Sequence, residues 1–301
     1  MRILICGAGA MGSLFGGLLH RAGEELWLLS HWAEHVARIR SEGLTLHQLD
    51  GTTLRLNIPI LDYNDPLPRE IDLAFISVKS ADTDDAATQA HAALAAHGVA
   101  ITMQNGLGNR ERLARVVGER RALLGVTSHG ATLLGPGEVR HAGSGHTAIA
   151  AQPDGVWARR IAALLTAAGI ESEVEQEIAP LLWNKLLVNI GINALTAILD
   201  LPNGALLTTE ARRALLRDAV EEGAAVARAK GIAIAPNPVA RTEAVARATA
   251  HNVSSMRADV QRGVATEIDV INGAIVREGA ALAIPTPVNA MLTRLVQAKG
   301  E

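Results

Sequence analysis

Three polar residues occur at every fourth position of one strongly apolar stretch. They are Lys185, Asn189 and Asn193, and their neighbours are mostly Leu, Val and Ile. On a helix this spacing aligns the three side chains along one face. A buried amide without a partner costs roughly 1–3 kcal/mol, so the stripe implies either internal partners, such as carbonyls or waters, or a ligand. A lysine in this setting can act as a proton donor with a tuned pKa.

A second polar group lies further along the chain. If Val239–Gly263 is one helix, Asn252 and Ser255 share a face, because they are three residues apart. Glu267 would then lie about 60° round the helix from Asn252, although Gly263 weakens that phase relation. Composition favours a solvated face or a helix cap here, and a site for a polar ligand is the alternative.

The N-terminus carries a third pattern, a short apolar run followed by Gly7-x-Gly9-x-x-Gly12 and an apolar helical segment. A strand that enters a helix through such a turn is typical of a pyrophosphate site. Gly7 permits the tight turn, Gly9 lets the backbone approach the phosphates, and Gly12 lets helix and strand pack closely. The helix N-terminus then presents its N–H groups to the anion. A glycine-rich loop that only packs is the alternative.

The first half of the chain supplies the elements that position the glycine turn. It alternates β-like runs with helical stretches, which predicts a parallel α/β sheet, with further strand-like pieces between Leu123 and Ala151. Ile58–Arg69 contains three prolines and is expected to be a surface loop. We expect strands at Ile3–Cys6, Leu26–Ser30, Leu73–Val78, Ala100–Met103 and Glu171–Glu175, and helices at Gly12–Arg21, Ala33–Glu42, Ala81–Ala96, Arg110–Val117 and Trp157–Ala168.

From Glu177 onward the pattern is helical almost without interruption. Pro180 falls in the first turn of a long apolar helix, where its missing N–H costs nothing. Further helices are expected at Thr208–Lys230, Val239–Gly263 and Thr266–Ala283, with Pro202-Asn203-Gly204, Pro236, Pro238, Pro285 and Pro287 marking ends and loops. The prediction is therefore an α/β chain, with a doubly wound Rossmann-type domain at 1–176 and an all-helical domain at 177–301.

Length, charge and cysteine content narrow the class of protein. The 301 residues suit two domains at about 150 residues each. A net charge of -3 without a basic run makes nucleic acid a poor partner. Cys6 is the single cysteine, so no internal disulfide forms and a reducing compartment is expected. Its place in the first strand is typical of a small buried hydrophobic residue.

Several other patterns are assigned no chemistry. The segment Leu186–Leu199 is interrupted by two asparagines and is too short to span a bilayer, so we expect a soluble, cytoplasmic protein without a membrane partner. Asp82, Asp84 and Asp85 suit a helix start, and Glu221-Glu222 suits a solvated face. His129, His141 and His146 lack metal-ligand spacing and are expected to be ordinary strand or loop residues, so no metal is predicted.

Motifs spread over the whole chain resemble the 2-dehydropantoate 2-reductase (ketopantoate reductase) family. The Lys-x-x-x-Asn-x-x-x-Asn and Asn-x-x-Ser elements are far more specific to it than the glycine loop. In order, the matching stretches are Gly7–Gly12, Lys79 in Ser-Val-Lys, Gln104-Asn105-Gly106, Trp183–Asn193, Leu195-Thr196-Ala197, Pro202-Asn203-Gly204, Asn252–Met256 and Thr266-Glu267-Ile268-Asp269. The resemblance implies reduction of 2-dehydropantoate to (R)-pantoate with NADPH, a step towards pantothenate and coenzyme A.

The resemblance also implies roles for individual residues. Lys185 would be the general acid that protonates the 2-oxo oxygen. The residues implied to hold substrate are Lys185, Asn189, Asn193, Asn203, Asn252, Val253, Ser254 and Ser255, with Ser255 at the carboxylate. The residues implied to contact the cofactor are Gly7, Ala8, Gly9, Ala10, Met11, Gly12, Lys79, Asn105, Ala131 and Glu267. Glu267 would also orient Lys185 or the nicotinamide end, and the active site is expected in the interdomain cleft.

One position departs from the family pattern. NADP-specific members often carry an arginine after the second strand, where this chain has His31. No Asp or Glu ends that strand to bind a ribose 2′-OH, which argues against strict NAD use. Ser30, His31, Lys79 and Arg38 are the candidates for the 2′-phosphate, and NADPH is the expected cofactor.

Three alternatives remain open at this point. A paralogue would reduce another branched oxo acid with the same lysine. A non-catalytic sensor would bind NADP(H) and regulate a partner, although it would need no proton donor. A structural dimerisation module is the third. The expected substrate is a small 2-oxo acid, and the expected state is a monomer or homodimer.

Overall fold

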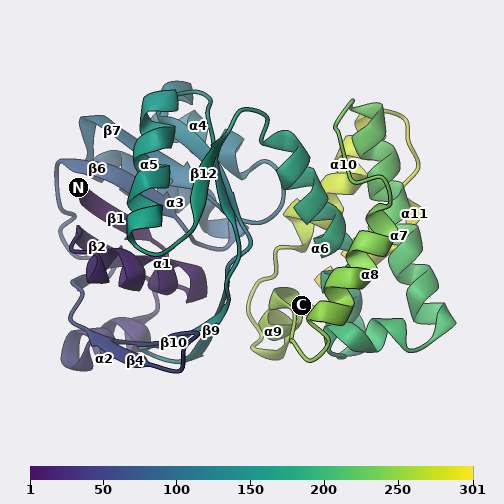
Figure 1. Cartoon of the computed structure of the whole chain (residues 1–301), viewed down its shortest axis with the longest axis horizontal. Coiled ribbons are helices and arrows are strands. Elements are labelled where there is room, and N and C mark those ends of the chain that lie inside the picture. The colour runs from purple at the N-terminus through teal and green to yellow at the C-terminus, as the bar shows by residue number, and fades with distance from the viewer. Residues whose placement is uncertain (301) are drawn as a thin grey trace. The chain divides into compact units, whose positions relative to one another are not determined.

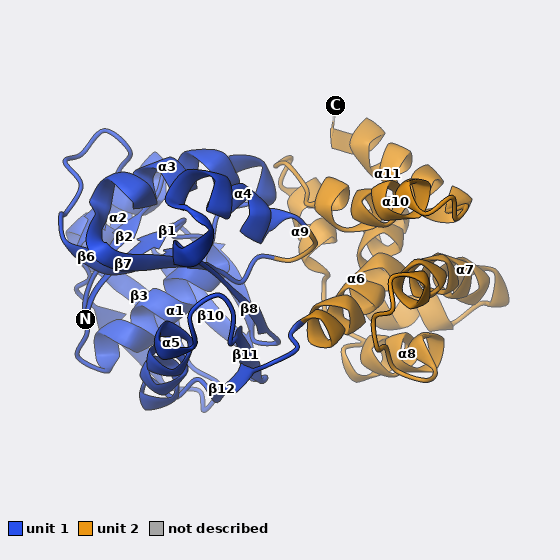
Figure 2. Cartoon of the chain, turned by 90° about the horizontal axis from the view of Figure 1, so that it is seen from above, with its two compact units in different colours: residues 1–104, 108–178 blue, residues 105–107, 179–301 orange. Residues whose placement is uncertain are grey.

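The computed structural model describes residues 1–300 and divides into two compact units. The N-terminal unit consists of residues 1–104 and 108–178, and the helical unit consists of residues 105–107 and those from Ala179 onward (Figure 2). The expected division at 176/177 does not anticipate that Asn105–Leu107 belong to the helical unit. The predicted fold class, an α/β unit followed by an all-helical one, is confirmed.

An eight-stranded sheet forms the centre of the N-terminal unit (Figure 1). Its order is β12-β11-β8-β7-β6-β1-β2-β5, and every neighbouring pair is parallel except β8 and β11. The bounds are β1 (Arg2–Cys6), β2 (Glu25–Leu29), β5 (Ile60–Leu61), β6 (Ile71–Ile76), β7 (Leu94–Thr102), β8 (Ala122–Thr127), β11 (Thr147–Ala150) and β12 (Ser172–Glu175). Since β1 lies between β2 and β6, the strand order reverses beside it, where open α/β sheets bind ligands.

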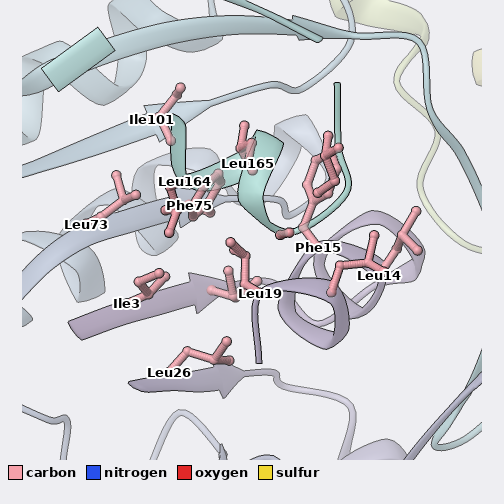
Figure 3. Close-up of a cluster of buried hydrophobic side chains, with 14 of the residues drawn as sticks. Ile3, Leu14, Phe15, Leu19, Leu26, Leu73, Phe75, Ile101, Leu164 and Leu165 are labelled. Carbon is pink, nitrogen blue, oxygen red and sulfur yellow. The ribbon is translucent and has the colours of Figure 1, made fainter. Parts of the chain in front are cut away.

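Helices cover both faces of this sheet, so its inner strands are apolar on both sides. Ile3 and Ile5 of β1 pack towards α1 and α5, whereas Leu4 and Cys6 pack towards α3 and α4. Figure 3 shows part of the first cluster, including Ile3 beside side chains of α1 and α5. The helices are α1 (Ala10–Arg21), α2 (Ala33–Glu42), α3 (Thr83–Ala93), α4 (Asn109–Val117) and α5 (Gly155–Ala167), with short 3-10 turns η1 (Ser80–Asp82) and η2 (Glu119–Arg121).

A second, four-stranded sheet was only partly anticipated. It has the order β4-β3-β10-β9 and consists of β3 (Leu44–His47), β4 (Thr53–Leu56), β9 (Gly130–Gly135) and β10 (Glu138–Gly143). The expected surface loop at Ile58–Arg69 is wrong in part, because Ile58 and Ile60 are buried and β5 pairs with β2. Strand pairing and burial of the two isoleucines hold this segment against the unit, although its three prolines favour a loop.

The helical unit is built from six α-helices in the described residues (Figure 1). They are α6 (Ala179–Leu199), α7 (Glu210–Ala229), α8 (Pro238–Ala248), α9 (Ser255–Gln261), α10 (Asn272–Ala281) and α11 (Pro287–Gly300), with 3-10 turns η3 (Asn203–Leu207) and η4 (Ile268–Val270). The single helix expected at Val239–Gly263 is wrong, since the chain leaves helical geometry between α8 and α9. The helix expected at Thr266–Ala283 is likewise divided into η4 and α10. Pro287 begins a helix rather than a loop, as its position in a first turn allows.

The apolar helix α6 is the core element of this unit. It is the one described helix with the length and composition of a membrane span, and 61% of its apolar window is buried within the protein. Neighbouring helices cover it closely, because a Cβ on Gly223 of α7 would overlap Ile190 and lie 2.8 Å from Leu187. Most of α6 is therefore packed against its own unit.

A buried amide network holds α11 in place. Asn272 donates to the Ile190 carbonyl at 3.2 Å and to Asn289 Oδ1 at 2.9 Å. Asn289 donates in turn to Glu222, whose carboxylate also accepts the backbone N–H groups of Val288 and Asn289. The expected solvated face at Glu221-Glu222 is thus wrong for Glu222, which caps the N-terminus of α11.

Candidate active site

The glycine turn after β1 has the geometry that a pyrophosphate needs. Gly7 has φ +101°, and a Cβ there would lie 2.6 Å from the Val78 nitrogen. A Cβ on Gly12 would overlap the Gly7 carbonyl oxygen, whereas one on Gly9 would meet no atom within 4 Å. Gly7 and Gly12 are therefore required by packing, and Gly9 leaves open space before the first turn of α1. That helix has no side chain capping its N-terminus, so its N–H groups suit an anion.

The turn is fixed at the point where the strand order reverses. The N–H groups of Gly7 and Ala8 both donate to the Leu29 carbonyl of β2, at 2.9 and 3.0 Å. On the other side, Ser77 N–H donates to the Cys6 carbonyl at 2.8 Å. Lys79 follows as a half-buried residue at the start of η1. Cys6 itself is fully buried, and burial raises the pKa of its thiol to about 12, so the expectation of an inert hydrophobic residue is supported.

The end of β2 presents only some of the expected phosphate ligands. Ser30 is buried and its Oγ accepts the Trp32 N–H at 3.2 Å. Arg38 forms an ion pair with Glu42 one turn along α2. His31, in contrast, is exposed, and its ring meets Tyr63 edge to face with centroids 6.0 Å apart. Lys79 is the fourth candidate, and all four remain predicted ligands of the 2′-phosphate.

Ala131 lies in β9, beside two histidines that are in contact. His129 Nδ1 and His141 Nε2 are 3.0 Å apart, and the rings stack. Burial lowers the pKa of both imidazoles, and for His129 the neighbouring His141 lowers it further. His141 lies in β10 and His129 in the loop before β9, so both are strand or loop histidines as expected. In residues 1–300 no group of three or more His, Cys, Asp or Glu side chains is arranged to hold a metal ion.

In the helical unit the polar stripe interrupts the apolar surface of α6. Asn193 is 7% exposed, while Asn189, one turn earlier, and Lys185, two turns earlier, are half-buried. Burial lowers the pKa of the Lys185 ammonium to about 8, and the charge of Glu267 opposes that shift. Glu267 is itself 7% exposed at the start of η4. A lysine of this pKa, beside a carboxylate, is suited to proton donation near neutral pH.

Asn105 forms a hydrogen bond with the same carboxylate. Its Nδ2 donates to Glu267 Oε2 at 3.4 Å, and the next residue but one, Leu107, donates its N–H to the Val270 carbonyl of η4 at 2.9 Å. The structure thus brings together Lys185, Glu267 and Asn105, three site residues that are far apart in the sequence.

The loop between α8 and α9 meets η3. Asn203 is 8% exposed. Its side-chain amide donates to the Thr249 hydroxyl at 2.9 Å, and its backbone N–H donates to the Asn252 carbonyl at 3.2 Å. Its Oδ1 is buried without a hydrogen-bond partner, a state that costs roughly 1–3 kcal/mol unless a ligand donor satisfies it. After Lys185, Asn203 is therefore the strongest indication of a polar ligand in the helical unit.

The second polar group differs from its expected arrangement. Asn252 lies outside any helix, so it shares no helical face with Ser255, and the phase argument linking it to Glu267 is wrong. Ser254 is buried, caps α9 through the Arg257 N–H and contacts the Thr196 hydroxyl at 2.7 Å. The helix-cap reading is therefore confirmed for Ser254. Asn252, Val253 and Ser255 are exposed and accessible to a ligand.

Two residues that were not predicted to belong to the site support it. Gln104 donates to the Val78 carbonyl at 2.8 Å and to Thr83 at 3.0 Å, and accepts from Thr102, so it anchors the chain immediately before Asn105. Thr249 orients Asn203 from 46 residues away. Gln104 was visible as part of Gln-Asn-Gly, but no local signal marked Thr249.

Comparison with known proteins agrees with this geometry. The family model for ketopantoate reductase PanE/ApbA matches residues 3–154, and the model for its C-terminal part matches residues 177–300. A 2-dehydropantoate 2-reductase of Halobacterium salinarum is 40% identical over 299 residues, covering 99% of this chain and 98% of the relative. One from Pyrococcus horikoshii is 35% identical, covering 99% and 97%.

Solved structures agree along the whole chain. A ketopantoate reductase of the same family from Ralstonia eutropha JMP134 has a TM-score of 0.91 at 35% identity, covering 100% of this chain and 98% of that one. A D-mandelate dehydrogenase with NADH and anilino(oxo)acetate has a TM-score of 0.94 at 31% identity, with the same coverage. The sequence, the glycine turn and the lysine-bearing helix thus lead to one conclusion: the chain belongs to the ketopantoate reductase family.

Proposed function

We propose that this protein is an NADP-dependent oxidoreductase that reduces 2-dehydropantoate to (R)-pantoate, in the pathway to pantothenate and coenzyme A. The observation that carries the proposal is Lys185, whose pKa is lowered to about 8 on a polar stripe beside the buried Glu267. The glycine turn, with its open space at Gly9, supports a dinucleotide cofactor. The relatives from Halobacterium salinarum and Pyrococcus horikoshii are both named 2-dehydropantoate 2-reductase, which supports the same activity here.

Lys185 supplies the proton in this reaction. NADPH, when bound, supplies the hydride that is added to C2 of the oxo acid. Negative charge then develops on the 2-oxo oxygen, where the Lys185 ammonium stabilises it and donates its proton. General acid catalysis of this kind contributes ~100- to 10,000-fold, and electrostatic stabilisation adds to it. Glu267 opposes the effect of burial and so favours the protonated, active form of the lysine.

Substrate oxygens are held by the remaining polar groups of the helical unit. Asn189 and Asn193 extend the stripe, and Asn203 brings a buried, unpartnered Oδ1 that suits a substrate hydroxyl. Asn252, Val253 and Ser255 supply accessible groups, with Ser255 at the carboxylate. Ser254 acts through the loop rather than through its hydroxyl, because that oxygen already caps α9.

Residues of the glycine turn hold the cofactor's pyrophosphate through backbone N–H groups, with Ala8, Ala10 and Met11 lining it. Lys79 and His31 serve the 2′-phosphate, and Ala131, Asn105 and Glu267 serve the nicotinamide end. We place the enzyme in the cytoplasm, as a monomer or homodimer that acts on a small molecule.

The test is loss of reduced-nicotinamide absorbance with 2-dehydropantoate, run in parallel with NADPH and NADH. The proposal expects NADPH-selective turnover at sub-millimolar substrate, falling about tenfold per pH unit above the Lys185 pKa of about 8, as the lysine loses its proton. Tight NADPH binding without reduction of any 2-oxo acid would instead support the sensor.

A second candidate rests on the D-mandelate dehydrogenase structure, whose TM-score of 0.94 covers the whole chain. On this reading the protein reduces a different 2-oxo acid, with NADH. The absence of an arginine at position 31 favours it, because a histidine grips a phosphate less firmly. A panel of branched and aryl 2-oxo acids, assayed with both cofactors, separates the two candidates.

A further inference from the structure

We propose that Gly106 is a positioning residue for the proton donor: by packing without a side chain against Val270, it keeps Asn105 on the carboxylate of Glu267. This inference rests on the proposed reductase function, in which Lys185 is the acid. Gly106 itself touches no reacting group, and its influence passes through Glu267.

The packing of Gly106 leaves no room for a side chain. Its φ is +85°, and a Cβ would overlap the Val270 carbonyl oxygen and lie 2.7 Å from both the Val270 carbonyl carbon and Cγ2. The obstacle is largely backbone, which cannot rotate aside as a side chain can. Leu107 N–H donates to the same Val270 oxygen at 2.9 Å, so this contact fixes the segment on η4.

Displacement at Val270 is transmitted directly to Glu267. The Val270 N–H donates to the Glu267 carbonyl at 3.2 Å, because Glu267 is the N-cap residue of η4 and Val270 is its last residue. On the other side, Asn105 precedes Gly106 and donates to Glu267 Oε2 at 3.4 Å. Moving the segment away from η4 therefore lengthens a hydrogen bond that is already long.

The consequence falls on Lys185. Within residues 1–300, Glu267 is the charged group whose field raises the pKa of Lys185 against the effect of burial. If Glu267 moves away, burial acts unopposed and the pKa of Lys185 falls. The lysine then loses its proton at a lower pH, and reduction fails earlier on the alkaline side.

Gly108 provides a matched control two residues further on. Its φ is +92°, close to that of Gly106, but a Cβ there would meet no atom within 4 Å. Gly106→Ala and Gly108→Ala therefore introduce similar backbone strain, and they differ in the contact with Val270.

The first experiment is the pH profile of kcat for both variants. We expect Gly106→Ala to move the alkaline limb down by about 1 pH unit, the size of effect that a nearby opposite charge has on a pKa. Its kcat at pH 8 should fall about fivefold as a result, while Gly108→Ala keeps the parental limb. Equal profiles in the two variants would overturn the proposal, as would a fall in kcat without any shift of the limb.

A second readout separates this inference from the proposed reaction. The reactivity of Lys185 towards acetic anhydride, followed by peptide mass spectrometry across pH, reports its pKa without substrate. Gly106→Ala should shift that curve down and Gly108→Ala should not, whichever oxo acid is reduced. Asn105→Ala, which keeps the backbone, should shift it in the same direction and tests the proposal if Gly106→Ala does not fold. An unshifted curve in Asn105→Ala and Gly106→Ala would contradict the inference even in an active enzyme.

Discussion

The two units of this chain prepare their polar sites in opposite ways. In the N-terminal unit the site consists of backbone groups: the glycine turn leads into the uncapped N-terminus of α1, and local packing requires a glycine at positions 7 and 12. In the helical unit the candidate site consists of side chains. Lys185 and Asn193 belong to α6, and Asn203, Asn105 and Glu267 come from other parts of the chain.

This difference assigns each unit a kind of selectivity. Backbone N–H groups bind any pyrophosphate, so the N-terminal unit recognises what dinucleotides share. Buried side chains with tuned pKa values act on one reaction, because their effect depends on distance and charge. A substitution in the helical unit should therefore lower the rate of reduction and leave NADPH binding intact. A substitution in the glycine turn should weaken NADPH binding and leave the proton donor intact.

The largest expected effect separates these two properties. Lys185→Ala should lower kcat at least about 100-fold, because it removes the proton donor, while the Kd for NADPH stays near the parental value. Stopped-flow turnover and fluorescence titration measure the two. Lys230→Ala is the matched control, since Lys230 pairs with Glu278 at the surface of the same unit. Near-normal turnover in Lys185→Ala would remove that residue from the role.

The second prediction concerns how the backbone site is held. His35 is fully buried: its Nδ1 accepts the Gly137 N–H at 2.9 Å, and its Nε2 lies 3.4 Å from Ser13 Oγ, which donates to the Ala8 carbonyl. Burial lowers the pKa of this imidazole from 6.5 to about 4. The folded state thus favours the neutral ring. The contribution of His35 to the free energy of unfolding is complete above pH 6.5 and is lost as the pH falls towards 4.

Chemical denaturation at pH 7 and pH 4 measures that loss. We expect His35 to account for about 3 kcal/mol of the free energy of unfolding that is lost between pH 7 and pH 4. In His35→Gln the difference between the two pH values should shrink by that amount, whereas His91→Gln, an exposed histidine of α3, should keep it. An unchanged difference in His35→Gln would show that other groups govern the acid lability.

The third prediction separates the role of Gly9 in cofactor binding from the role of Gly12 in packing. Gly9→Ala should leave the Tm unchanged, because its Cβ meets open space and its φ of -72° suits alanine, but should raise the Kd for NADPH about tenfold. Gly12→Ala should instead cost about 2 kcal/mol of stability, because its Cβ overlaps the Gly7 carbonyl. Equal stability of the two variants would contradict the packing described for Gly12.

The same contrast explains what the sequence could predict. The glycine turn and the strand and helix beside it are local, so the sequence predicted the close packing at Gly7 and Gly12, whereas the approach of the phosphates to Gly9 remains a prediction. Helix α2 was predicted at its observed bounds, Ala33–Glu42. Strands β3 and β4 were missed although Leu44 and Leu46 alternate with polar residues, a signal that was present and not used.

The helical site was predictable only as a stripe. The spacing of Lys185, Asn189 and Asn193 is local, but the partners of that stripe are not. Thr249 reaches Asn203, and Asn105 reaches Glu267 over 162 positions, through tertiary contacts that no spacing encodes. The break between α8 and α9 has a similar cause, because Ser254 ends the interruption by capping α9 and contacting Thr196 of α6.

The smallest expected effect lies where the N-terminal unit does use a side chain for selectivity. The backbone of the glycine turn treats NADPH and NADH alike, so a preference between them must come from groups near the ribose, such as His31. That ring is exposed against Tyr63, whereas the other nearby candidates Ser30 and Arg38 are engaged by Trp32 and Glu42.

His31→Arg should therefore lower the KM for NADPH about fivefold, because a guanidinium grips a phosphate with two charge-assisted hydrogen bonds at an exposed site. The KM for NADH should change little, since NADH lacks the 2′-phosphate. His91→Arg adds the same charge on α3 and should change neither value. If His31→Arg changed both KM values alike, the added charge would be acting on the shared pyrophosphate, and selectivity would have to be sought at Lys79 instead.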